Sequence, residues 1–474
     1  MSFDAVVLAR IHFALTIMFH YLFPPLSIGL GLILVLTEGL YLRTGKRLYE
    51  DMARFWTRIF AVNFAVGVAT GIVMEFEFGT NWSTYARFVG DVFGSALAAE
   101  GVFAFFLESG FLAVLVFGWE RVSAKMHFFA TCMVALGAAF SATWIVIANS
   151  WQQTPAGFHV VGSGVNARAE ITDFWAMVFN PSSLHRLGHV MLGAYILGGF
   201  FVMSVASFYI LRRRHLEFAE KSFAIGLAVA TVASLAQLIS GDGNAKMVGQ
   251  YQPAKMAAFE GHFTSENHGT EMYLFGLPDA GEQRVKYGIA VPYMLSLLMY
   301  EDPDRPVRAL DTFPERDRPP AGTPFQAYHL MIALGTLNIA LTLTACYLLW
   351  KKRLFQKVWL MRIFGLAVLS PYLANEAGWV AAETGRQPWT VYGLLRTADS
   401  VSKSVPAGQI LASIVIFGVI YALLFAVWVF VMNAKIVHGP DESGTPPSET
   451  SERGLIEAVA SYAHPHARTL TEES

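Results

Sequence analysis

Charged residues are scarce in this chain: Asp, Glu, Lys and Arg together make up 15% of its 474 residues. A soluble protein of this length carries about a quarter, so the scarcity excludes the soluble class. Cysteine is almost absent, and the two that occur, Cys132 and Cys346, lie inside apolar runs. This excludes a disulfide framework, a cysteine zinc site and an iron–sulfur cluster. The net charge of −2 excludes a nucleic-acid-binding role that depends on a basic surface.

Long apolar runs are what the chain has in abundance. Hydrophobic residues make up 54% of it and the mean hydropathy is +0.44, which places it among integral membrane proteins. No small-residue cleavage site follows the first run, so we expect the spans themselves to direct insertion. We predict an all-α bundle of about nine transmembrane helices. Runs of roughly 20 residues, enough to cross a bilayer, occur near 14–42, 55–77, 94–118, 126–149, 187–211, 222–239, 326–350, 358–378 and 408–434.

Basic residues indicate the side of the membrane on which each loop lies. Lysine and arginine concentrate in cytoplasmic loops, and here they follow the first, third, fifth and seventh spans. With nine spans these loops share one side, which predicts a cytoplasmic C-terminus and an N-terminus outside. The residues that carry this signal are Arg43, Lys46, Arg47, Arg54, Arg58, Arg121, Lys125, Arg212, Arg213, Arg214, Lys221, Lys351, Lys352, Arg353, Lys357 and Arg362.

The longest break in the apolar pattern separates the sixth span from the seventh. It predicts four sections: spans one to six in 1–239, an external loop in 240–325, spans seven to nine in 326–436, and a tail in 437–474. The external loop is too long to be a simple turn. The tail is rich in Ser, Thr, Pro and Glu, so we expect it to be disordered in the cytoplasm.

Two acids interrupt the third span. Glu100 and Glu108 are eight residues apart, which places both on one side of an α-helix about 12 Å apart. A carboxyl group in an apolar helix is costly unless it is paired or used. We therefore favour proton handling or a cofactor contact over a structural pairing. Glu77, near the end of the second span, is expected at a solvated rim.

Histidine and methionine in three spans are candidate metal ligands. His20 lies in the first span just before Pro24 and Pro25, His189 lies near the start of the fifth, and Met331 lies in the seventh. Each has an ordinary alternative, because a histidine in a membrane helix is more often a packing residue and a methionine is usually core filler. A histidine and a methionine that face each other would instead hold a low-spin haem.

The segment 383–389, Glu-Thr-Gly-Arg-Gln-Pro-Trp, brings a carboxylate, a guanidinium and an indole to the end of the eighth span. Gly385 and Pro388 break a helix, so Glu383 and Arg386 lie where the span ends. A buried carboxylate there needs a partner, a metal or a proton.

This segment and four others resemble subunit I of the cytochrome bd-type quinol oxidases. The five occur in one order on a nine-span frame, and the resemblance covers nearly the whole chain. The loop segment Gln-Pro-Ala-Lys-Met-Ala-Ala-Phe-Glu resembles the family's quinol-loop motif. The four other segments are 67–82 in the second span, 100–109 in the third, the loop segment 252–260, and 376–379 in the eighth.

The resemblance implies a haem-containing terminal oxidase that oxidises membrane quinol and reduces O2 to water. Its proton motive force would come from vectorial protons, without pumping. His20 and Glu383 resemble the ligands of two high-spin haems, one a haem b and the other a haem d or a third haem b. His189 and Met331 resemble the ligands of a low-spin haem b. The metal in each case is haem iron.

Further residues and partners are implied by the same resemblance. Lys255 and Glu260 match the quinol-binding pair, and Trp379 and Arg386 match residues beside the haems and their propionates. Glu100 and Glu108 match acids implicated in oxygen chemistry and proton delivery, with Glu120 at the cytoplasmic end of that path. The resemblance also implies a cytochrome bd subunit II, a small single-span subunit, and the bacterial cytoplasmic (inner) membrane as location.

The chain departs from the family pattern at three histidines. His12 stands where the family often has Gln, and His329 stands where many members carry Arg. His185 precedes His189 by four residues and is expected at the membrane interface, although it could compete as a ligand. The external loop is short, which resembles the short-loop branch that includes the cyanide-insensitive oxidases.

Two rival functions share some of these features. A polytopic transporter or channel would explain Glu100 and Glu108 as ion or proton sites. It would not explain the pair His189 and Met331, and the chain shows no internal repeat of the kind found in many transporters. An assembly or quinone-binding subunit without an oxygen site is a further alternative, which the retained His20 and Glu383 disfavour.

Overall fold

The computed structural model describes residues 4–440. Within these residues nine helical segments are long and apolar enough to cross a membrane, which confirms the predicted all-α, nine-span class. Of the tail predicted at 437–474, residues 441–474 lie outside the described residues. The nine segments are Ala5–Thr44, Arg47–Thr80, Gly90–Phe117, Ala124–Gln153, Ser183–Leu211, Leu216–Tyr251, Gly322–Trp350, Val358–Thr384 and Ala407–His438.

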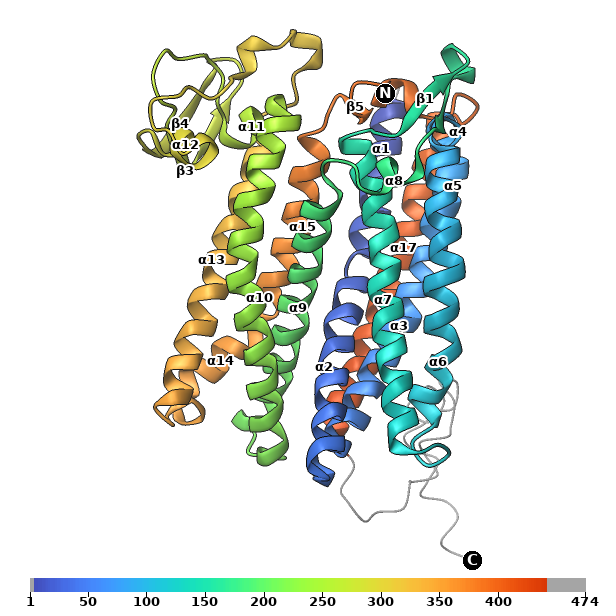
Figure 1. Ribbon diagram of the computed structural model, residues 1–474, viewed down its shortest axis with the longest axis vertical. Helices are drawn as coiled ribbons and strands as arrows, with labels where there is room; N and C mark the ends of the chain where they lie inside the picture. The colour runs from blue at the N-terminus through green and yellow to red at the C-terminus, as the bar shows by residue number, and fades with distance from the viewer. Residues whose placement is uncertain (1–3, 441–474) are drawn as a thin grey trace, which may run out of the picture.

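The spans form two groups that stand side by side (Figure 1). One group contains α1 (Ala5–His20), α2 (Pro24–Thr44), α3 (Arg47–Thr80), α5 (Gly90–Ala99), the π-helix η1 (Glu100–Phe105), α6 (Phe106–Phe117), α7 (Ala124–Gln153) and α17 (Ala407–His438). The other contains α9 (Ser183–Leu211), α10 (Leu216–Tyr251), α13 (Gly322–Trp350), α14 (Val358–Ala367) and α15 (Leu369–Thr384).

The short elements lie at the end of the bundle that carries the N-terminus (Figure 1). The six strands among them form three antiparallel two-stranded sheets, in which β1 pairs with β2, β3 with β4 and β5 with β6. The elements are α4 (Ser83–Phe88), β1 (Phe158–Val161), β2 (Arg168–Ile171), α8 (Phe174–Val178), α11 (Pro253–Glu260), β3 (Met272–Asp279), β4 (Arg284–Val291), α12 (Met294–Tyr300), β5 (Trp389–Val391), β6 (Leu395–Arg396) and α16 (Thr397–Ser400).

α9 is the packing centre that joins the two groups. It contacts α10, α14 and α15 on one side and α2 and α7 on the other. Its crossing with α2 depends on a glycine pair: a Cβ on Gly29 would come within 2.7 Å of Gly198 Cα. Only small residues allow two helix backbones to approach this closely, and helices within membranes commonly pack in this way.

The first span is broken, and His20 is the last residue of its first helix. Pro24 and Pro25 open α2, where a missing N–H is tolerated because the first turn has no partner for it. The 40 residues of Ala5–Thr44 would form a rod about 60 Å long if straight, which exceeds the bilayer. The break therefore places His20 inside the bundle, beside α3.

A π-helix interrupts the third span between its two acids. In an uninterrupted α-helix, eight residues leave Glu100 and Glu108 about 80° apart around the axis. The wide turns of η1 hold about one extra residue and reduce that angle to about 20°. The predicted common side for the two acids is therefore reinforced by a local structure that the sequence does not signal.

α10 is longer than the apolar pattern of the sixth span indicates. The predicted span ends at 239, whereas the helix continues to Tyr251 through the polar segment Gly241-Asp-Gly-Asn244. This extension carries the chain directly to α11, so the loop motif 252–260 begins at the end of a rigid helix.

Candidate functional site

Glu383 lies near the C-terminal end of α15, against the last turns of α7. Its Oε1 accepts hydrogen bonds from Asn149 Nδ2 at 3.2 Å and from Gln153 Nε2 at 3.3 Å. Its Oε2 pairs with the Arg386 guanidinium, and Arg386 Nη1 donates to Gln152 Oε1 at 2.7 Å. One cation and two amides therefore surround the carboxylate, which is the donor set that an ionised carboxylate requires.

Lys255 of α11 reaches the same amide side chain. Its ammonium group donates to Gln153 Oε1 at 2.8 Å and to Gln252 Oε1 at 3.2 Å. Gln153 therefore accepts from Lys255 and donates to Glu383, so a single side chain connects the loop to α15. Burial and the nearby Arg186 hold the pKa of Lys255 well below its usual value. Because the two bonds use two of its three N–H donors, the third remains for another acceptor.

Glu260 ends α11 and is buried, with 4% of its surface exposed. Tyr328 of α13 is its hydrogen-bond partner, while Oε2 has no partner within residues 4–440. Burial raises the pKa of Glu260 to about 8, and the bond to Tyr328 partly offsets this. Phe259 stacks on Tyr328 with ring centroids 4.7 Å apart, which holds α11 against α13. A carboxyl group with a free oxygen and a pKa near 8 can accept a proton from a bound ligand.

Arg186 of α9 completes this cluster, and the sequence analysis did not single it out. Its guanidinium donates to Asn149 Oδ1, and Asn149 donates to Glu383. Gln152 and Gln153 were missed because the apolar pattern of the fourth span ends at 149, whereas the helix continues to Gln153. Asn149 is the last residue of that apolar pattern. The available signal was the run of polar side chains that follows the apolar segment without a helix breaker.

His20 has a defined tautomer. Its Nδ1 lies 2.9 Å from Thr70 Oγ1, and that hydroxyl lies 3.0 Å from the carbonyl oxygens of Val66 and Gly67. Because the hydroxyl donates its single proton to a carbonyl, it accepts from Nδ1–H. Nε2 then carries the lone pair, which is the state that a metal ligand requires. Gly71 packs against the same ring, where a Cβ would lie 3.2 Å from Cε1.

His189 and Met331 lie on α9 and α13, which both pack against α10. His189 Nε2 lies 3.1 Å from Gln237 Nε2, and His189 Nδ1 lies 3.4 Å from Ser240 Oγ. Gln237 Oε1 has no partner within the described residues. Met331 Sδ lies against α15 at Gly378, where a Cβ would approach it to 2.7 Å. Glycine at this position is therefore what lets the sulfur lie close to the α15 backbone.

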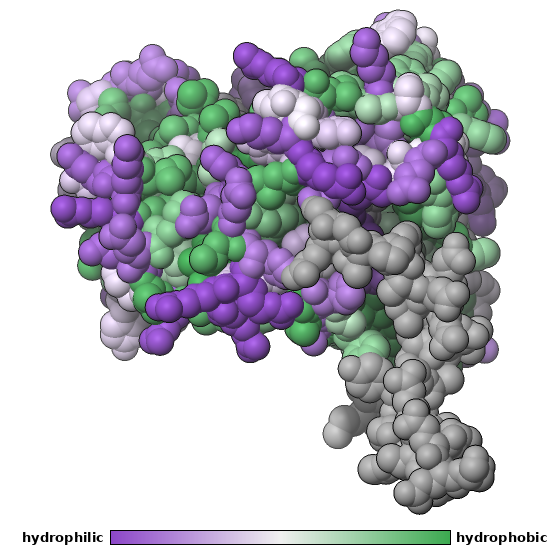
Figure 2. All heavy atoms as spheres, turned by 90° about the horizontal axis from the view of Figure 1, so that it is seen from below, coloured by the Kyte–Doolittle hydropathy of each residue, from purple (hydrophilic) through white to green (hydrophobic). Residues whose placement is uncertain are grey.

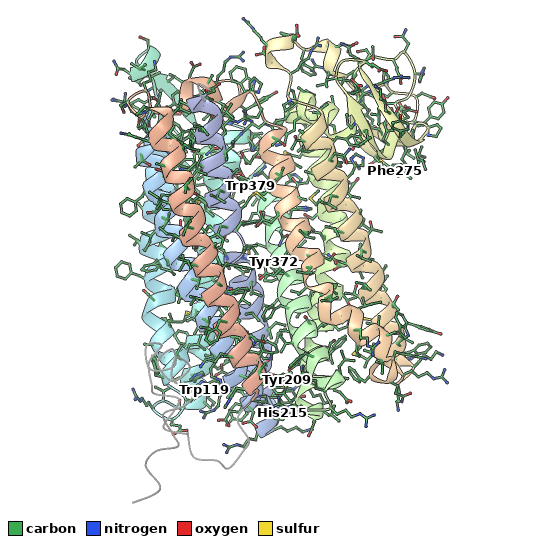
Figure 3. All side chains as sticks on the ribbon, turned by 180° about the vertical axis from the view of Figure 1, so that it is seen from behind. Trp119, Tyr209, His215, Phe275, Tyr372 and Trp379 are labelled. Atoms are coloured by element: carbon green, nitrogen blue, oxygen red, sulfur yellow. The ribbon has the colours of Figure 1, made fainter. Side chains whose placement is uncertain are left out.

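Trp379 and Arg386 lie on and just after α15. Figure 3 shows Trp379 in the region between the two helix groups, and its ring centroid is 6.4 Å from that of Phe13 on α1. Arg386 is 6% exposed. Both predicted residues thus lie inside the bundle near its N-terminal end, on the same helix end as Glu383.

Glu100 and Glu108 both face α7. Ser141 Oγ donates to Glu100 Oε1 at 2.6 Å, and a Cβ on Gly137 would lie 2.9 Å from the Glu108 Cβ. Gly137 and Ser141 are four residues apart and therefore lie on one side of α7. Glu120, in contrast, is highly exposed and lies 3.8 Å from Arg54 Nη1.

The expectation of a solvated Glu77 is wrong. Glu77 is 4% exposed, and its Oε1 lies 2.9 Å from Nδ1 of His12, which is also buried. Asn81 Nδ2 lies 2.7 Å from the same nitrogen. This burial was not predictable from the apolar pattern because α3 continues past the apolar run, and because His12 supplies the partner from a different helix.

The two other histidines at which the chain departs from the family pattern, His185 and His329, lie away from the pair of His12 and Glu77. His185 is exposed, as expected for an interfacial position. His329 connects α13 to the β3–β4 hairpin: its Nδ1 lies 2.8 Å from the Phe325 carbonyl oxygen and its Nε2 lies 2.8 Å from the Tyr273 carbonyl oxygen.

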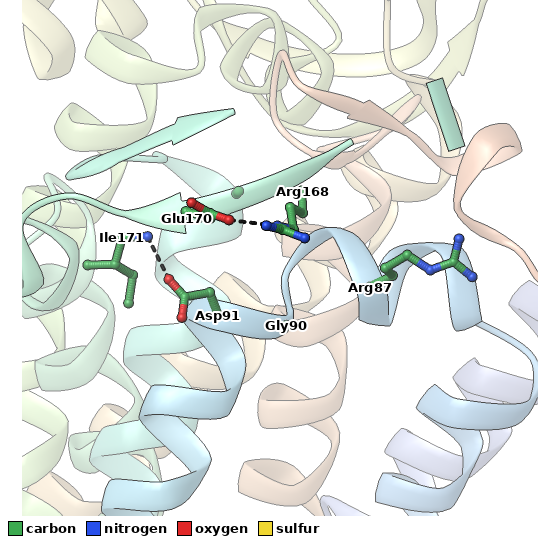
Figure 4. A pocket seen from close by; sticks show the side chains of 7 residues that line it. Arg87, Gly90, Asp91, Arg168, Glu170 and Ile171 are labelled. Carbon is green, nitrogen blue, oxygen red and sulfur yellow. Dashed lines mark hydrogen bonds and ion pairs between the residues drawn. The ribbon is translucent and has the colours of Figure 1, made fainter. Parts of the chain in front are cut away.

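A solvent-open hollow of about 490 Å³ lies beside β2, in the helix group that contains α5 (Figure 4). Its charged side chains are bonded within the hollow or to its rim: Arg168 Nε donates to Glu170 at 2.6 Å, and Asp91 accepts from the Ile171 N–H at 2.7 Å. Its polar groups thus already have partners, and none of the predicted site residues lines it.

Comparison with known proteins gives consistent results. The family model described as cytochrome bd terminal oxidase subunit I matches residues 8–440. A cytochrome bd ubiquinol oxidase subunit 1 of Bacillus subtilis (strain 168) is 41% identical over 92% of this chain and 94% of its own length. A cytochrome bd-II ubiquinol oxidase subunit 1 of Escherichia coli (strain K12) is 33% identical over 92% of this chain and 97% of its own length.

A solved structure agrees with these sequence matches. The bd oxidase from Geobacillus thermodenitrificans superposes with a TM-score of 0.84 and 28% sequence identity. The match covers 93% of this chain and all of that chain. The chain therefore belongs to the cytochrome bd terminal oxidase subunit I family of membrane-bound oxidoreductases.

Proposed function

We propose that this chain oxidises a membrane quinol and passes the electrons to O2, which is reduced to water. The observation that carries the proposal is the shared amide of Gln153, which connects Lys255 to Glu383. These residues match the family's quinol-binding lysine and haem-ligating carboxylate. A quinol held by α11 would therefore lie one side chain from a haem ligand.

The candidate ligands suit haem iron. His20 presents a lone pair on Nε2, and Met331 lies against the open backbone at Gly378. Buried N–H donors of Arg186, Arg386 and Asn375 have no hydrogen-bond partner within residues 4–440, as expected where propionates supply the missing acceptors.

Four residues would hold three haems. His20 and Glu383 would ligate two high-spin haems, one a haem b and the other a haem d or haem b, and His189 with Met331 a low-spin haem b. Bound haem would supply one-electron transfer and the binding of O2. Arg386 would neutralise a propionate, and Trp379 would pack beside a macrocycle.

Quinol oxidation would use the two polar residues of α11. The quinol gives up two electrons and two protons and becomes a quinone. The free oxygen of Glu260 would accept a hydroxyl proton, and the third N–H of Lys255 would donate to a ring oxygen. Because α11 lies at the N-terminal end of the bundle, these protons would leave on that side.

Proton delivery for water formation would use the acids of the third span. Glu108 and Glu100 face one side of α7, and Ser141 donates to Glu100. Protons would enter from the opposite end of the bundle, near Glu120. Because release and uptake would then occur on opposite faces, charge would be separated across the membrane without pumping.

The basic residues supply the orientation. Figure 2 looks onto the end of the bundle opposite the N-terminus and shows a rim of hydrophilic side chains there. The exposed basic clusters Lys46-Arg47, Arg212-Arg213-Arg214 and Lys351-Lys352-Arg353 follow α2, α9 and α13. We assign this face to the cytoplasm. The N-terminus and the quinol-binding section 240–325 then lie outside a bacterial inner membrane.

A second membrane subunit would cover one exposed face of the chain. Phe76, Phe103 and Phe106 on α3, η1 and α6 are each at least 65% exposed, and Glu75 on α3 is also exposed. A carboxylate on such a surface is costly against lipid, which favours a polypeptide partner. We assign this face to cytochrome bd subunit II. A small single-span subunit would be a further component.

A reduced-minus-oxidised optical spectrum of the purified protein tests the proposal. We expect a b-type α-band, and a second band to its red if one high-spin haem is a haem d. His20→Ala and Glu383→Ala should each lose one high-spin haem signal and keep the low-spin one. His185→Ala is the matched control, because His185 is exposed on the same helix as His189. A folded protein without any haem band would overturn the proposal.

A further inference from the structure

The β3–β4 hairpin has two unlike faces. Its inner face packs on the protein: Gly276 accepts a hydrogen bond from Gln326 of α13 at 2.5 Å, and Val285 packs against buried residues of the loop. Its outer face carries the cross-strand pair Phe275 and Ile289, each 53% exposed. The outer face of an antiparallel sheet in water is normally polar, so this apolar face indicates a different environment.

The hairpin is also divided along its length. Its tip carries an ion-pair network in which Lys286 Nζ lies 2.5 Å from Asp279 and 2.6 Å from Glu282, which also binds Arg284. The cross-strand pair Phe275 and Ile289 lies farther from the tip than this network. A charged tip above an apolar base is the distribution expected of an element that lies at a boundary between water and hydrocarbon.

The attachment of the hairpin to α13 gives its depth. Trp350 ends α13 and is followed by Lys351, which marks the interface at that end. The hydrocarbon core takes roughly 20 helical residues, so its other edge lies near residue 330. His329 stands at that edge and bonds the Tyr273 carbonyl oxygen at 2.8 Å. The base of the hairpin therefore lies at the level of the hydrocarbon edge.

The neighbouring surface identifies what covers the apolar face. The exposed large side chains that follow His329 along α13 are apolar, among them Leu330 and Ile332 at 48% and 46% exposure. Figure 3 shows Phe275 on the underside of the hairpin, beside the bundle and near the height of Trp379. The other exposed apolar face, which is formed by Phe76, Phe103 and Phe106 and includes Glu75, lies on α3, η1 and α6 in the other helix group (Figure 1). The surface of α13 thus has the composition of a lipid-facing helix.

We propose that the β3–β4 hairpin is an interfacial membrane element whose outer face rests on the acyl chains of the lipid leaflet beside α13. Val285 also contacts Gly261, the residue that follows α11, where a Cβ would lie 2.7 Å from Val285 Cγ2. The hairpin therefore supports α11 from the lipid side. This inference concerns the surface alone and does not depend on the proposed oxidase chemistry.

Nitroxide labels on single cysteines test the proposal. The background replaces Cys132 and Cys346 with alanine, and the whole protein with its co-purifying subunits is placed in lipid nanodiscs. Labels go on Phe275→Cys and Ile289→Cys, and the measurement is collision with O2, which concentrates in lipid, against a water-soluble nickel chelate. Leu330→Cys on α13 is the lipid control, and Glu282→Cys at the tip is the water control.

The two labels on the outer face should respond like the label at position 330, with O2 collisions exceeding those with nickel. A response like that at position 282 would overturn the proposal by placing the face in water. Low accessibility to both reagents would also overturn it, because a polypeptide would then cover the face. The two sites share one face, so if one variant does not fold the other still decides the outcome.

Discussion

Two buried carboxyl groups at opposite ends of the bundle differ in how completely their neighbours satisfy them. Glu38 of α2 is 1% exposed; its Oε1 lies 2.6 Å from His127 Nδ1, and its Oε2 accepts from Thr131 at 2.5 Å. Glu260 of α11 is almost as buried but keeps one oxygen without a partner in the described chain. Burial is therefore similar, and the difference is whether an oxygen remains for a ligand.

The Glu38 cluster is closed on every side. His127 Nε2 lies 3.2 Å from the Leu115 carbonyl oxygen, and Trp119 packs on the His127 ring with centroids 3.8 Å apart. These contacts join α2 to α6 and α7 and give every polar side-chain atom of Glu38, His127 and Thr131 a partner. A closed cluster of this kind stabilises the helix packing, whereas Glu260 keeps one oxygen available for a ligand.

The largest expected effect is on Glu260. Glu260→Gln removes the proton acceptor, so quinol turnover should fall by about 10²- to 10⁴-fold. Because the pKa of Glu260 is about 8, the carboxyl group is mostly neutral at pH 7 and glutamine preserves its charge and shape. In the unmodified protein turnover should rise about tenfold per pH unit up to pH ~8, because the deprotonated fraction rises at that rate.

The measurement is steady-state quinol oxidation from pH 6 to 9, with the optical spectrum recorded to verify haem content. The variant should show a low rate without the rise toward pH ~8. A variant that keeps both the rate and the pH profile would remove Glu260 from the reaction.

The second effect is on stability and concerns the closed cluster. Glu38→Ala leaves His127 and Thr131 buried without their partner, which should lower the free energy of unfolding by about 3–5 kcal/mol. The matched control is Glu120→Ala, because Glu120 is exposed and its removal should cost within about 0.5 kcal/mol. Thermal unfolding in detergent compares the two variants. Equal melting temperatures would show that the Glu38 cluster does not stabilise the helix packing.

The smallest expected effect distinguishes the two glutamines that bind Lys255, Gln153 and Gln252. Gln153→Leu and Gln252→Leu each remove one acceptor, so both should raise the KM for quinol by up to about tenfold. Gln153 also donates to Glu383, so its variant alone should shift the midpoint potential of the haem that we propose Glu383 to ligate. Redox titration followed optically measures the shift. The same potential in both variants would contradict a link from α11 to Glu383.

The spans were predictable because each is a long apolar run. The break in the first span was not predicted, although Pro24 and Pro25 open its second helix. The candidate ligands were found because a histidine or an acid inside such a run is conspicuous. Their partners on other helices were not. Thr70, which sets the tautomer of His20, and Gly378, which admits Met331, look like ordinary helix residues until the helices are packed.

Polar helix ends were the second source of error. The last turn of α7 and the extension of α10 are helical because they pack in the bundle, although their hydropathy is that of a loop. Gln153 lies in the first of these and the loop motif follows the second. The burial of Glu77 was missed partly because α3 continues past the apolar run, and partly because its partner His12 comes from a different span.

The π-helix Glu100–Phe105 allows the number of residues between Glu100 and Glu108 to differ among related chains. A chain that lacks one residue here would have a regular α-helix with seven residues from acid to acid, which also leaves the two side chains about 20° apart. The length of the interval can thus change by one while the relative phase of the acids is kept. A gap at this point in a comparison of two relatives would not indicate a change in the chemistry of the pair.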